Sequence, residues 1–175
     1  MKKKSAGLLM YRRRGDGALQ VLLAHPGGPF WRNKDEGAWT IPKGEYDDPE
    51  QPLDAARREF TEETGFAVTP PFTALGEVVQ KGGKHITAWA FAGDCDPAQI
   101  RCNTFELEWP SRSGRRQSFP EIDRIEWFEL DGARRKILPA QRPLLDRLEK
   151  EVGQPDAEGV GIEQKAQKKS EKKTP

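Results

Sequence analysis

The chain has 175 residues, which is enough for one domain with a hydrophobic core and too few for two domains of ordinary size. Its 29 lysine and arginine residues nearly cancel its 28 aspartate and glutamate residues, so the overall charge does not indicate a nucleic-acid-binding or membrane-surface protein. Its two cysteines, Cys95 and Cys102, lack the spacing of a zinc site, a redox pair or a disulfide framework. We therefore expect a reduced, cytoplasmic protein with neither a membrane partner nor a stable nucleic-acid partner.

The N-terminal segment has one feature of a secretion signal, a basic start followed by apolar residues. The apolar run from Ala6 to Tyr11 has only six residues and ends in three arginines. This run is too short for the hydrophobic part of a signal peptide or for a membrane span. We therefore predict that it forms the first strand of the domain.

Hydrophobic periodicity predicts three strands in the first part of the chain, at residues 5–11, 19–24 and 38–41. A helix is predicted at residues 52–64, because Pro52 suits the first turn of a helix and Gly65 suits its left-handed end. Within this helix Ala56 and Phe60 recur at helical spacing, as part of an apolar stripe that can pack on a sheet.

The second half of the chain is predicted to contain four more strands. Residues 73–80 and 85–93 flank the sequence KGGK and are predicted to form a hairpin, because glycine accepts the positive φ of a tight turn. Further strands are predicted at residues 105–109 and 124–130, on either side of an Arg/Ser/Gly-rich loop at residues 110–117.

Two helices are predicted near the C-terminus. Asp131 is expected to cap a short helix, and residues 141–150 carry leucines at helical spacing. Beyond Val152 there is almost nothing apolar to bury, so residues 153–175 are predicted to form a disordered polar tail. The domain is thus expected at residues 1–152, with an α/β fold in which helices sandwich a mixed sheet.

The predicted helix at residues 52–64 carries a cluster of carboxylates. Glu59, Glu62 and Glu63 share one face of it, and like charges at such spacings destabilise a helix by about 0.2–0.5 kcal/mol per pair. A divalent cation among them would reverse this cost, because Mg²⁺ and Mn²⁺ prefer oxygen ligands. Since Mg²⁺ is commonly completed by substrate phosphates, the pattern indicates a phosphorylated substrate and attack of an activated water on phosphorus.

The loop before this helix supplies further groups for the same chemistry. Lys43 can offer a positive charge to a phosphate, and Gly44 lets the backbone approach closely and present a carbonyl to the metal. Glu50 is placed to pair with Arg58, which would hold the loop and the helix together.

The segment from Gly44 to Phe66 resembles the Nudix box. That pattern reads G, five residues, E, seven residues, R-E, an aliphatic or aromatic residue, any residue, E-E, any residue, G and a final apolar residue. The nine specified positions are filled in register by Gly44, Glu50, Arg58, Glu59, Phe60, Glu62, Glu63, Gly65 and Phe66. The sequences AWTIPKG at residues 38–44 and FPEIDRIEWFEL at residues 119–130 also resemble Nudix hydrolases.

This resemblance implies a Nudix-like α/β/α sandwich that binds Mg²⁺ or Mn²⁺ and cleaves a diphosphate linked to another moiety. It implies that Glu59, Glu62 and Glu63 are metal ligands and that the carbonyl of Gly44 adds another. It also implies that Arg58 orients a glutamate. Glu59 is the favoured catalytic base, with Arg58 and Glu62 completing the catalytic set.

Some Nudix enzymes recruit a further metal-binding acid from a loop before a late strand. Glu121, six residues before Trp127, matches that place, although acids before strands are also common in turns. The loop residues Arg112 and Arg115 are candidates for steering a polyphosphate substrate, with plain solubility as the alternative. Trp31, in a Gly/Pro-rich loop, is the tryptophan best placed to stack on a nucleobase.

The implied substrates are nucleoside triphosphates and dinucleoside polyphosphates, because AWTIPKG resembles members that act on these compounds. One alternative is an ADP-ribose or nucleotide-sugar pyrophosphatase. Another is a Nudix-derived nucleotide sensor or RNA-binding module that has lost catalysis. Such modules commonly lack one or more box glutamates, and this chain keeps all of them.

Overall fold

The computed structural model describes residues 2–153, so the predicted polar tail, apart from Gly153, lies outside the described residues. The strands are β1 (Lys4–Arg13), β2 (Leu19–Pro26), β3 (Lys43–Glu45), β4 (Thr73–Gln80), β5 (Lys84–Ala92), β6 (Thr104–Glu108), β7 (Arg116–Pro120) and β8 (Ile122–Glu129). The helices are α1 (Pro52–Thr64), α2 (Leu130–Lys136) and α3 (Arg142–Val152), with short 3₁₀ turns η1 (Pro97–Gln99) and η2 (Pro139–Gln141).

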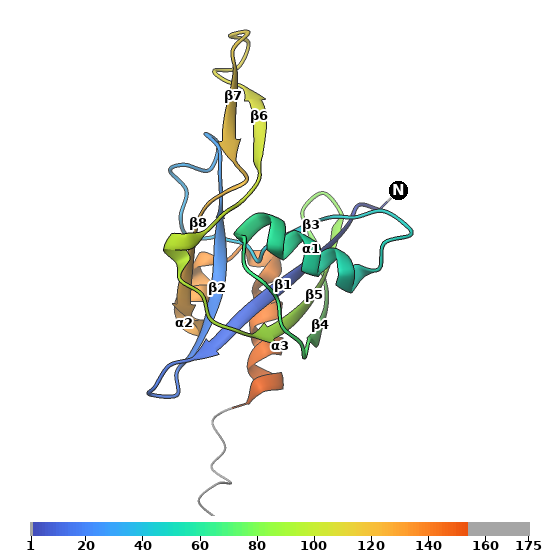
Figure 1. Ribbon diagram of the computed structural model, residues 1–175, viewed down its shortest axis with the longest axis vertical. Coiled ribbons are helices and arrows are strands. Elements are labelled where there is room, and N and C mark those ends of the chain that lie inside the picture. The colour runs from blue at the N-terminus through green and yellow to red at the C-terminus, as the bar shows by residue number, and fades with distance from the viewer. Residues whose placement is uncertain (1, 154–175) are drawn as a thin grey trace, which may run out of the picture.

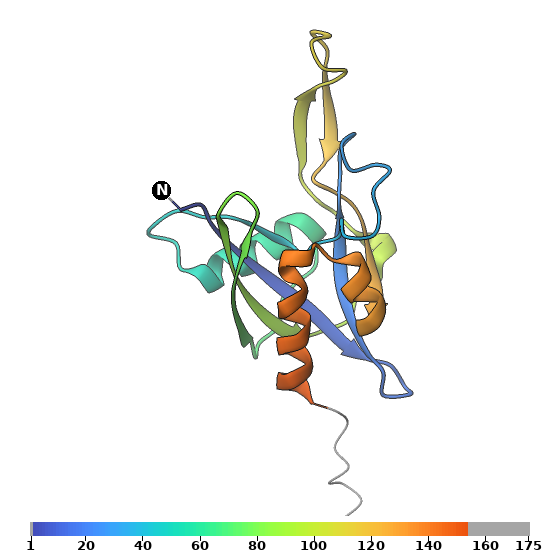
Figure 2. The same ribbon diagram turned by 180° about the vertical axis from the view of Figure 1, so that it is seen from behind.

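Six strands form one mixed sheet in the order β4-β5-β1-β2-β8, with β3 paired to the first half of β1. The pair β1–β5 is parallel, and the remaining pairs in this sheet are antiparallel. Helix α1 covers one face of the sheet, as Figure 1 shows, and the view from behind shows α2 and α3 on the other face (Figure 2). The predicted α/β/α sandwich with a mixed sheet is therefore confirmed.

Alternation along β1 sends successive side chains to the two faces of the sheet. Leu8 and Met10 are buried in the core beneath α1, whereas Leu9 is buried in the core that includes the leucines of α3. Beneath α1, the rings of Phe60 and Phe91 meet edge to face with their centroids 5.2 Å apart. Docking of this apolar stripe determines which face of α1 remains free for its carboxylates.

Most of the predicted elements are present. Helix α1 has the predicted bounds, and Gly65 ends it in the left-handed conformation with φ of 80°. The hairpin of β4 and β5 forms around KGGK, and the leucines of α3 are buried as its spacing predicted.

The strand predicted at residues 38–41 is wrong. Trp39 and Thr40 make only isolated bridges, to Ile137 and Ala24, and regular pairing occurs three residues later in β3. The N–H of Trp39 instead donates to the carbonyl of Lys136, the last residue of α2, at 3.0 Å, and its carbonyl accepts from the N–H of Leu138 at 2.7 Å. This segment therefore closes the fold between β2 and α2 rather than extending a sheet.

Two further predictions near the C-terminal half need correction. Asp131 does not cap α2, because Glu129 occupies the cap position and Asp131 lies in the first turn. The loop predicted at residues 110–117 is shorter than expected, since β7 begins at Arg116.

Strands β6 and β7 form a separate two-stranded ribbon that projects from the body of the molecule (Figure 1). We call residues 104–120 the arm. At its base, Phe105 lies so close to Gly28 that a Cβ on that glycine would be 2.9 Å from the ring. The rings of Phe30 and Trp109 meet edge to face, with centroids 5.4 Å apart. The arm is thus anchored on the loop that follows β2.

Cys95 and Cys102 are both free thiols, as their spacing predicted. The Cys102 Sγ donates a hydrogen bond to the carbonyl of Ile122 at 3.1 Å. Across residues 2–153, every helix falls short of the length and apolar character needed to cross a membrane.

Candidate active site

The acidic face of α1 meets strand β3. The carboxylate of Glu63 accepts a hydrogen bond from the backbone N–H of Lys43 at 3.0 Å. The carboxylate of Glu59 lies directly against Gly44, where an added Cβ would be 2.0–2.3 Å from the carboxylate atoms. Only glycine leaves room for Glu59 in this position. The strand, loop and helix thereby bring Gly44, Glu59 and Glu63 together.

Arg58 links the loop before α1 to the acidic face of the helix. Its Nε and Nη2 atoms donate to the two carboxylate oxygens of Glu50, at 2.8 and 2.9 Å. Its Nη1 atom donates to Glu59 at 2.7 Å and to Glu62 at 3.2 Å. The predicted ion pair between Glu50 and Arg58 is therefore present, and the same guanidinium orients two glutamates of the box.

A pocket of about 310 Å³ adjoins these carboxylates. Charged and polar residues on its wall include Trp31, Thr40, Lys43, Glu63, Gln80 and Glu121. Glu121 directly follows the arm and is held by its backbone, whose N–H donates to the Asn103 carbonyl at 2.9 Å. Its carbonyl accepts from the N–H of Gly27, also at 2.9 Å. The end of the arm thus delivers a fourth glutamate to the pocket that contains Glu63.

The carboxylates influence one another electrostatically. The pKa of Glu63 is raised to about 8, mainly by burial and to a smaller extent by the charges of Glu59 and Glu121, against the opposing hydrogen bond and charge of Lys43. The pKa of Glu121 is also raised, first by burial and then by the charges of Glu59 and Glu62. Burial lowers the pKa of Lys43. The raised pKa values of Glu63 and Glu121 thus show that ionisation of these crowded, partly buried carboxylates is unfavourable without a further cation.

The donor set suits a hard divalent cation. Within residues 2–153, no three Asp, Glu, His or Cys side chains converge closely enough to hold a metal ion. Glu59 and Glu62 are both turned toward Arg58, so they must rotate before they can share a ligand. The available donors are nonetheless carboxylate oxygens together with a backbone carbonyl at Gly44, the chemistry that Mg²⁺ and Mn²⁺ prefer.

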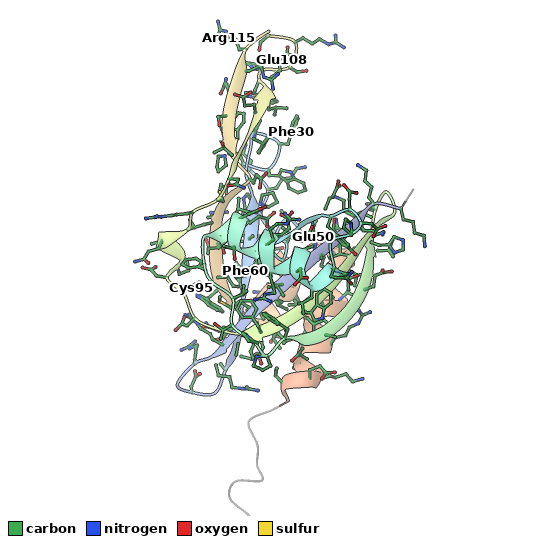
Figure 3. All side chains as sticks on the ribbon, turned by 45° about the vertical axis from the view of Figure 1, so that its right-hand side comes forward. Phe30, Glu50, Phe60, Cys95, Glu108 and Arg115 are labelled. Atoms are coloured by element: carbon green, nitrogen blue, oxygen red, sulfur yellow. The ribbon has the colours of Figure 1, made fainter. Side chains whose placement is uncertain are left out.

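The arginines predicted to contact substrate lie elsewhere. Arg112 is in the loop at the end of the arm, and Figure 3 shows Arg115 there too, far from Phe60 on α1 and from Glu50 in the loop before α1. The structure does not bring these arginines to the carboxylates. Trp31 does line the pocket, as its exposed loop suggested.

Two polar residues of the pocket were not predicted from the sequence. Thr40 stands inside AWTIPKG, which was the one available signal for it. Gln80 ends β4 without any motif around it. Only the folding of β4 beside the loop before β3 makes it a pocket residue.

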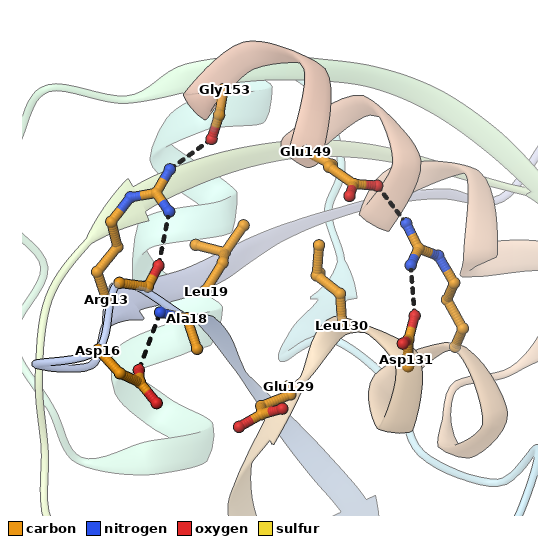
Figure 4. A pocket seen from close by; sticks show the side chains of 11 residues that line it. Arg13, Asp16, Ala18, Leu19, Glu129, Leu130, Asp131, Glu149 and Gly153 are labelled. Atoms are coloured by element: carbon orange, nitrogen blue, oxygen red, sulfur yellow. Dashed lines mark hydrogen bonds and ion pairs between the residues drawn. The ribbon is translucent and has the colours of Figure 1, made fainter. Parts of the chain in front are cut away.

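A larger cavity of about 470 Å³ lies between the β1–β2 turn, α2 and α3 (Figure 4). It contains none of the predicted site residues. Two of its arginines already have partners within the protein. Arg13 donates to the carbonyls of Gly17 and Gly153, and Arg134 forms ion pairs with Asp131 and Glu149. We therefore assign the chemistry to the smaller pocket beside α1.

The sandwich fold and the glutamate face of α1 define a hydrolase that acts on acid anhydrides. The family described as the NUDIX domain matches residues 1–148, so the chain belongs to the Nudix family and is a Nudix hydrolase. Pyrophosphohydrolase activity on nucleoside diphosphate derivatives is the activity of this class.

Among known proteins, the RNA pyrophosphohydrolase of Bartonella henselae is 35% identical over 149 residues, covering 74% of this chain and 77% of that protein. An Ap4A hydrolase of C. elegans, in a binary complex, has a similar fold, with a TM-score of 0.59, 22% identity and coverage of 86% of this chain and 97% of that one. The NUDIX domain of Shewanella oneidensis NrtR, complexed with ADP ribose, gives a TM-score of 0.60 at 15% identity, covering 87% and 90% of the two chains.

Proposed function

We propose that this chain is a divalent-metal-dependent hydrolase that cleaves a phosphoanhydride bond of a nucleoside triphosphate or a dinucleoside polyphosphate by attack of water. The observation that supports this most strongly is the grouping of Glu59, Glu62, Glu63 and Glu121 beside a pocket that also contains Lys43. Carboxylates crowded in this way suit metal ions whose coordination a polyphosphate completes. The two free thiols support a reducing, cytoplasmic environment for this reaction.

The box residues would hold Mg²⁺ or Mn²⁺ through Glu59, Glu62, Glu63 and the carbonyl of Gly44, with Glu121 as a further ligand. Bound ions of this kind neutralise phosphate oxygens and lower the pKa of a bound water. Lys43 lies on the same pocket wall and can pair with a phosphate oxygen.

Glu59 is the proposed general base. Its carboxylate accepts a hydrogen bond from Arg58 Nη1 at 2.7 Å. On the other side it lies against Gly44, in the space that any larger side chain would fill. In the reaction the water oxygen forms a bond to phosphorus, its proton passes to Glu59, and the anhydride bond breaks with departure of the phosphate leaving group. Glu62 shares Arg58 with Glu59, so the three residues act as one unit.

The arm supports a role in binding longer substrates. Arg112 and Arg115 are too remote to serve the reacting phosphates in the arrangement described, but they can contact a distal nucleotide or phosphate. A second candidate substrate is therefore the 5′-triphosphate end of an RNA, which the 35% identical RNA pyrophosphohydrolase also favours.

The deciding experiment is a substrate screen with the full-length protein. Nucleoside triphosphates, dinucleoside polyphosphates, 5′-triphosphorylated RNA, ADP-ribose and nucleotide sugars are incubated with Mg²⁺ or Mn²⁺, and the products are separated by ion-exchange chromatography. Parallel reactions contain EDTA. We expect metal-dependent hydrolysis of a nucleoside triphosphate with release of phosphate or pyrophosphate, or of a dinucleoside polyphosphate into two mononucleotides. Exclusive cleavage of ADP-ribose or nucleotide sugars, or no cleavage at all, would contradict the proposal.

A further inference from the structure

One wall of the active-site pocket is backed by a chain of hydrogen-bonded amides with a fixed direction. Gln141, in η2, is completely buried, and its Oε1 accepts a hydrogen bond from the backbone N–H of Ile41 at 3.0 Å. A backbone N–H can only donate. This contact therefore identifies the Gln141 oxygen, and its amide nitrogen must point the other way.

The orientation of the Gln141 amide determines the orientation of the Gln80 amide. The Nε2 group of Gln141 donates to Thr40 Oγ1 at 2.8 Å and to Gln80 Oε1 at 2.9 Å. The Gln80 oxygen is thus committed to an acceptor role inside the protein. Its Nε2 group has no hydrogen-bond partner in residues 2–153, and it is not among the buried polar atoms that lack one. The free donor of Gln80 is therefore accessible to solvent, on a residue that lines the pocket.

The neighbouring neutral side chains on this wall offer no free hydrogen-bond acceptor to a base. The Thr40 hydroxyl donates to the Ile41 carbonyl at 2.9 Å and accepts from Gln141. The indole N–H of Trp31 is a second donor on the wall without a partner among the described residues. The remaining acceptors there, Glu63 and Glu121, belong to the proposed metal site.

We propose that this wall recognises the edge of a nucleobase and selects bases that carry a carbonyl oxygen where adenine and cytosine carry an amino group. Guanine, hypoxanthine and uracil offer that acceptor to the Gln80 amide, whereas an amino group opposes it donor to donor. The indole of Trp31 supplies a surface on which any base can stack. This inference rests on the proposed action on nucleotides and names the base that the same pocket prefers.

The test compares two purines that differ at position 6, where hypoxanthine has a carbonyl and adenine an amino group, and at the adjacent N1, which is protonated only in hypoxanthine. ITP and ATP are compared by kcat/KM with Mg²⁺, and IDP and ADP are compared by isothermal titration calorimetry as a readout that does not require turnover. We expect the wild-type protein to prefer the inosine nucleotide by about tenfold in both measurements, because a buried donor left without an acceptor costs about 1–3 kcal/mol. If the inosine-to-adenosine ratio of the wild-type protein is close to one in both measurements, the inference is overturned.

Two substitutions at Gln80 make the test specific. Gln80→Met removes the donor and should bring the preference close to one. Gln80→Glu keeps an acceptor for Gln141 but presents an acceptor to the base, so it should favour the adenine nucleotide. The control Gln99→Glu adds the same charge on an exposed residue outside the pocket and should keep the wild-type ratio. Full retention of the wild-type ratio in Gln80→Met would also overturn the inference.

Gln141 acts as a positioning residue, and it can be tested without altering the wall itself. Gln141→Glu removes the Nε2 donor, so the Gln80 amide should turn round and present its oxygen to the base. The expected result is an inverted ratio in a protein with native circular dichroism; if this buried charge prevents folding, the Gln80 variants decide. If the inosine-to-adenosine ratio of this variant stays at the wild-type value while hydrolysis is intact, only the base selection is contradicted. Absence of metal-dependent hydrolysis in the wild-type protein would instead contradict the proposed function.

Discussion

Gly44→Ala tests whether Glu59 must lie against the backbone of β3. The new Cβ would be 2.0–2.3 Å from the Glu59 carboxylate, far inside van der Waals contact, so the carboxylate must move by about 1 Å or more. Gly44 does not have a positive φ, so alanine can adopt its backbone conformation. We therefore expect a folded protein whose kcat/KM falls by about 10²-fold, the usual effect of misplacing a reacting group by this distance.

The assay measures kcat/KM with Mg²⁺ on the best substrate from the screen, together with the melting temperature. Gly15→Ala is the matched control, because its Cβ would have nothing within 4 Å and Gly15 also lacks a positive φ. It should retain wild-type activity. A folded Gly44→Ala variant with wild-type kcat/KM would refute the argument that this glycine makes room for a working carboxylate.

Four further variants test the site and its boundaries. Glu62→Gln and Glu63→Gln should each lower kcat with Mg²⁺ by about 10²-fold or more without loss of the fold, since each acid is proposed to serve the metal. Arg58→Lys should lower kcat by about 10–100-fold, because lysine keeps the charge but cannot bond both oxygens of Glu50 and also reach the box glutamates. Deletion of everything after Val152 should leave kcat/KM nearly unchanged.

These predictions have simple controls and clear failures. Glu36→Gln removes a carboxylate that is exposed and outside the pocket, so it should leave kcat unchanged. Near-normal Mg²⁺-dependent turnover in both Glu62→Gln and Glu63→Gln would exclude them as ligands. Wild-type activity of Arg58→Lys would show that the guanidinium fork is dispensable, and a severe loss on truncation would place the tail in the site.

The local part of the site could be predicted from sequence because its geometry is local. Three glutamates at i, i+3 and i+4 must share a helix face wherever the helix forms, and Pro52 and Gly65 mark both of its ends. The pairing of Glu50 with Arg58 spans only eight residues and lies within the same loop and helix. Burial of the opposite stripe then fixes where the carboxylates point.

The rest of the pocket could not be predicted because distant segments build it. Gln141 reaches Thr40 across 101 residues of sequence, and no periodicity in either segment indicates that contact. Strand β7 was missed because four of its five residues are exposed, which leaves no alternation to detect. The sequence 38–41 looks like a strand by composition, yet its backbone partners are a single residue of β2 and residues at and just after the end of α2.

The account depends most directly on where the metal ion binds. Crystals of the full-length protein soaked in Mn²⁺ with a non-hydrolysable nucleotide analogue would locate the ion by its anomalous scattering. We predict a peak bounded by Glu59, Glu62, Glu63 and the Gly44 carbonyl, in contact with a phosphate oxygen of the analogue. A nucleotide bound in the pocket with manganese located only elsewhere would contradict the central claim.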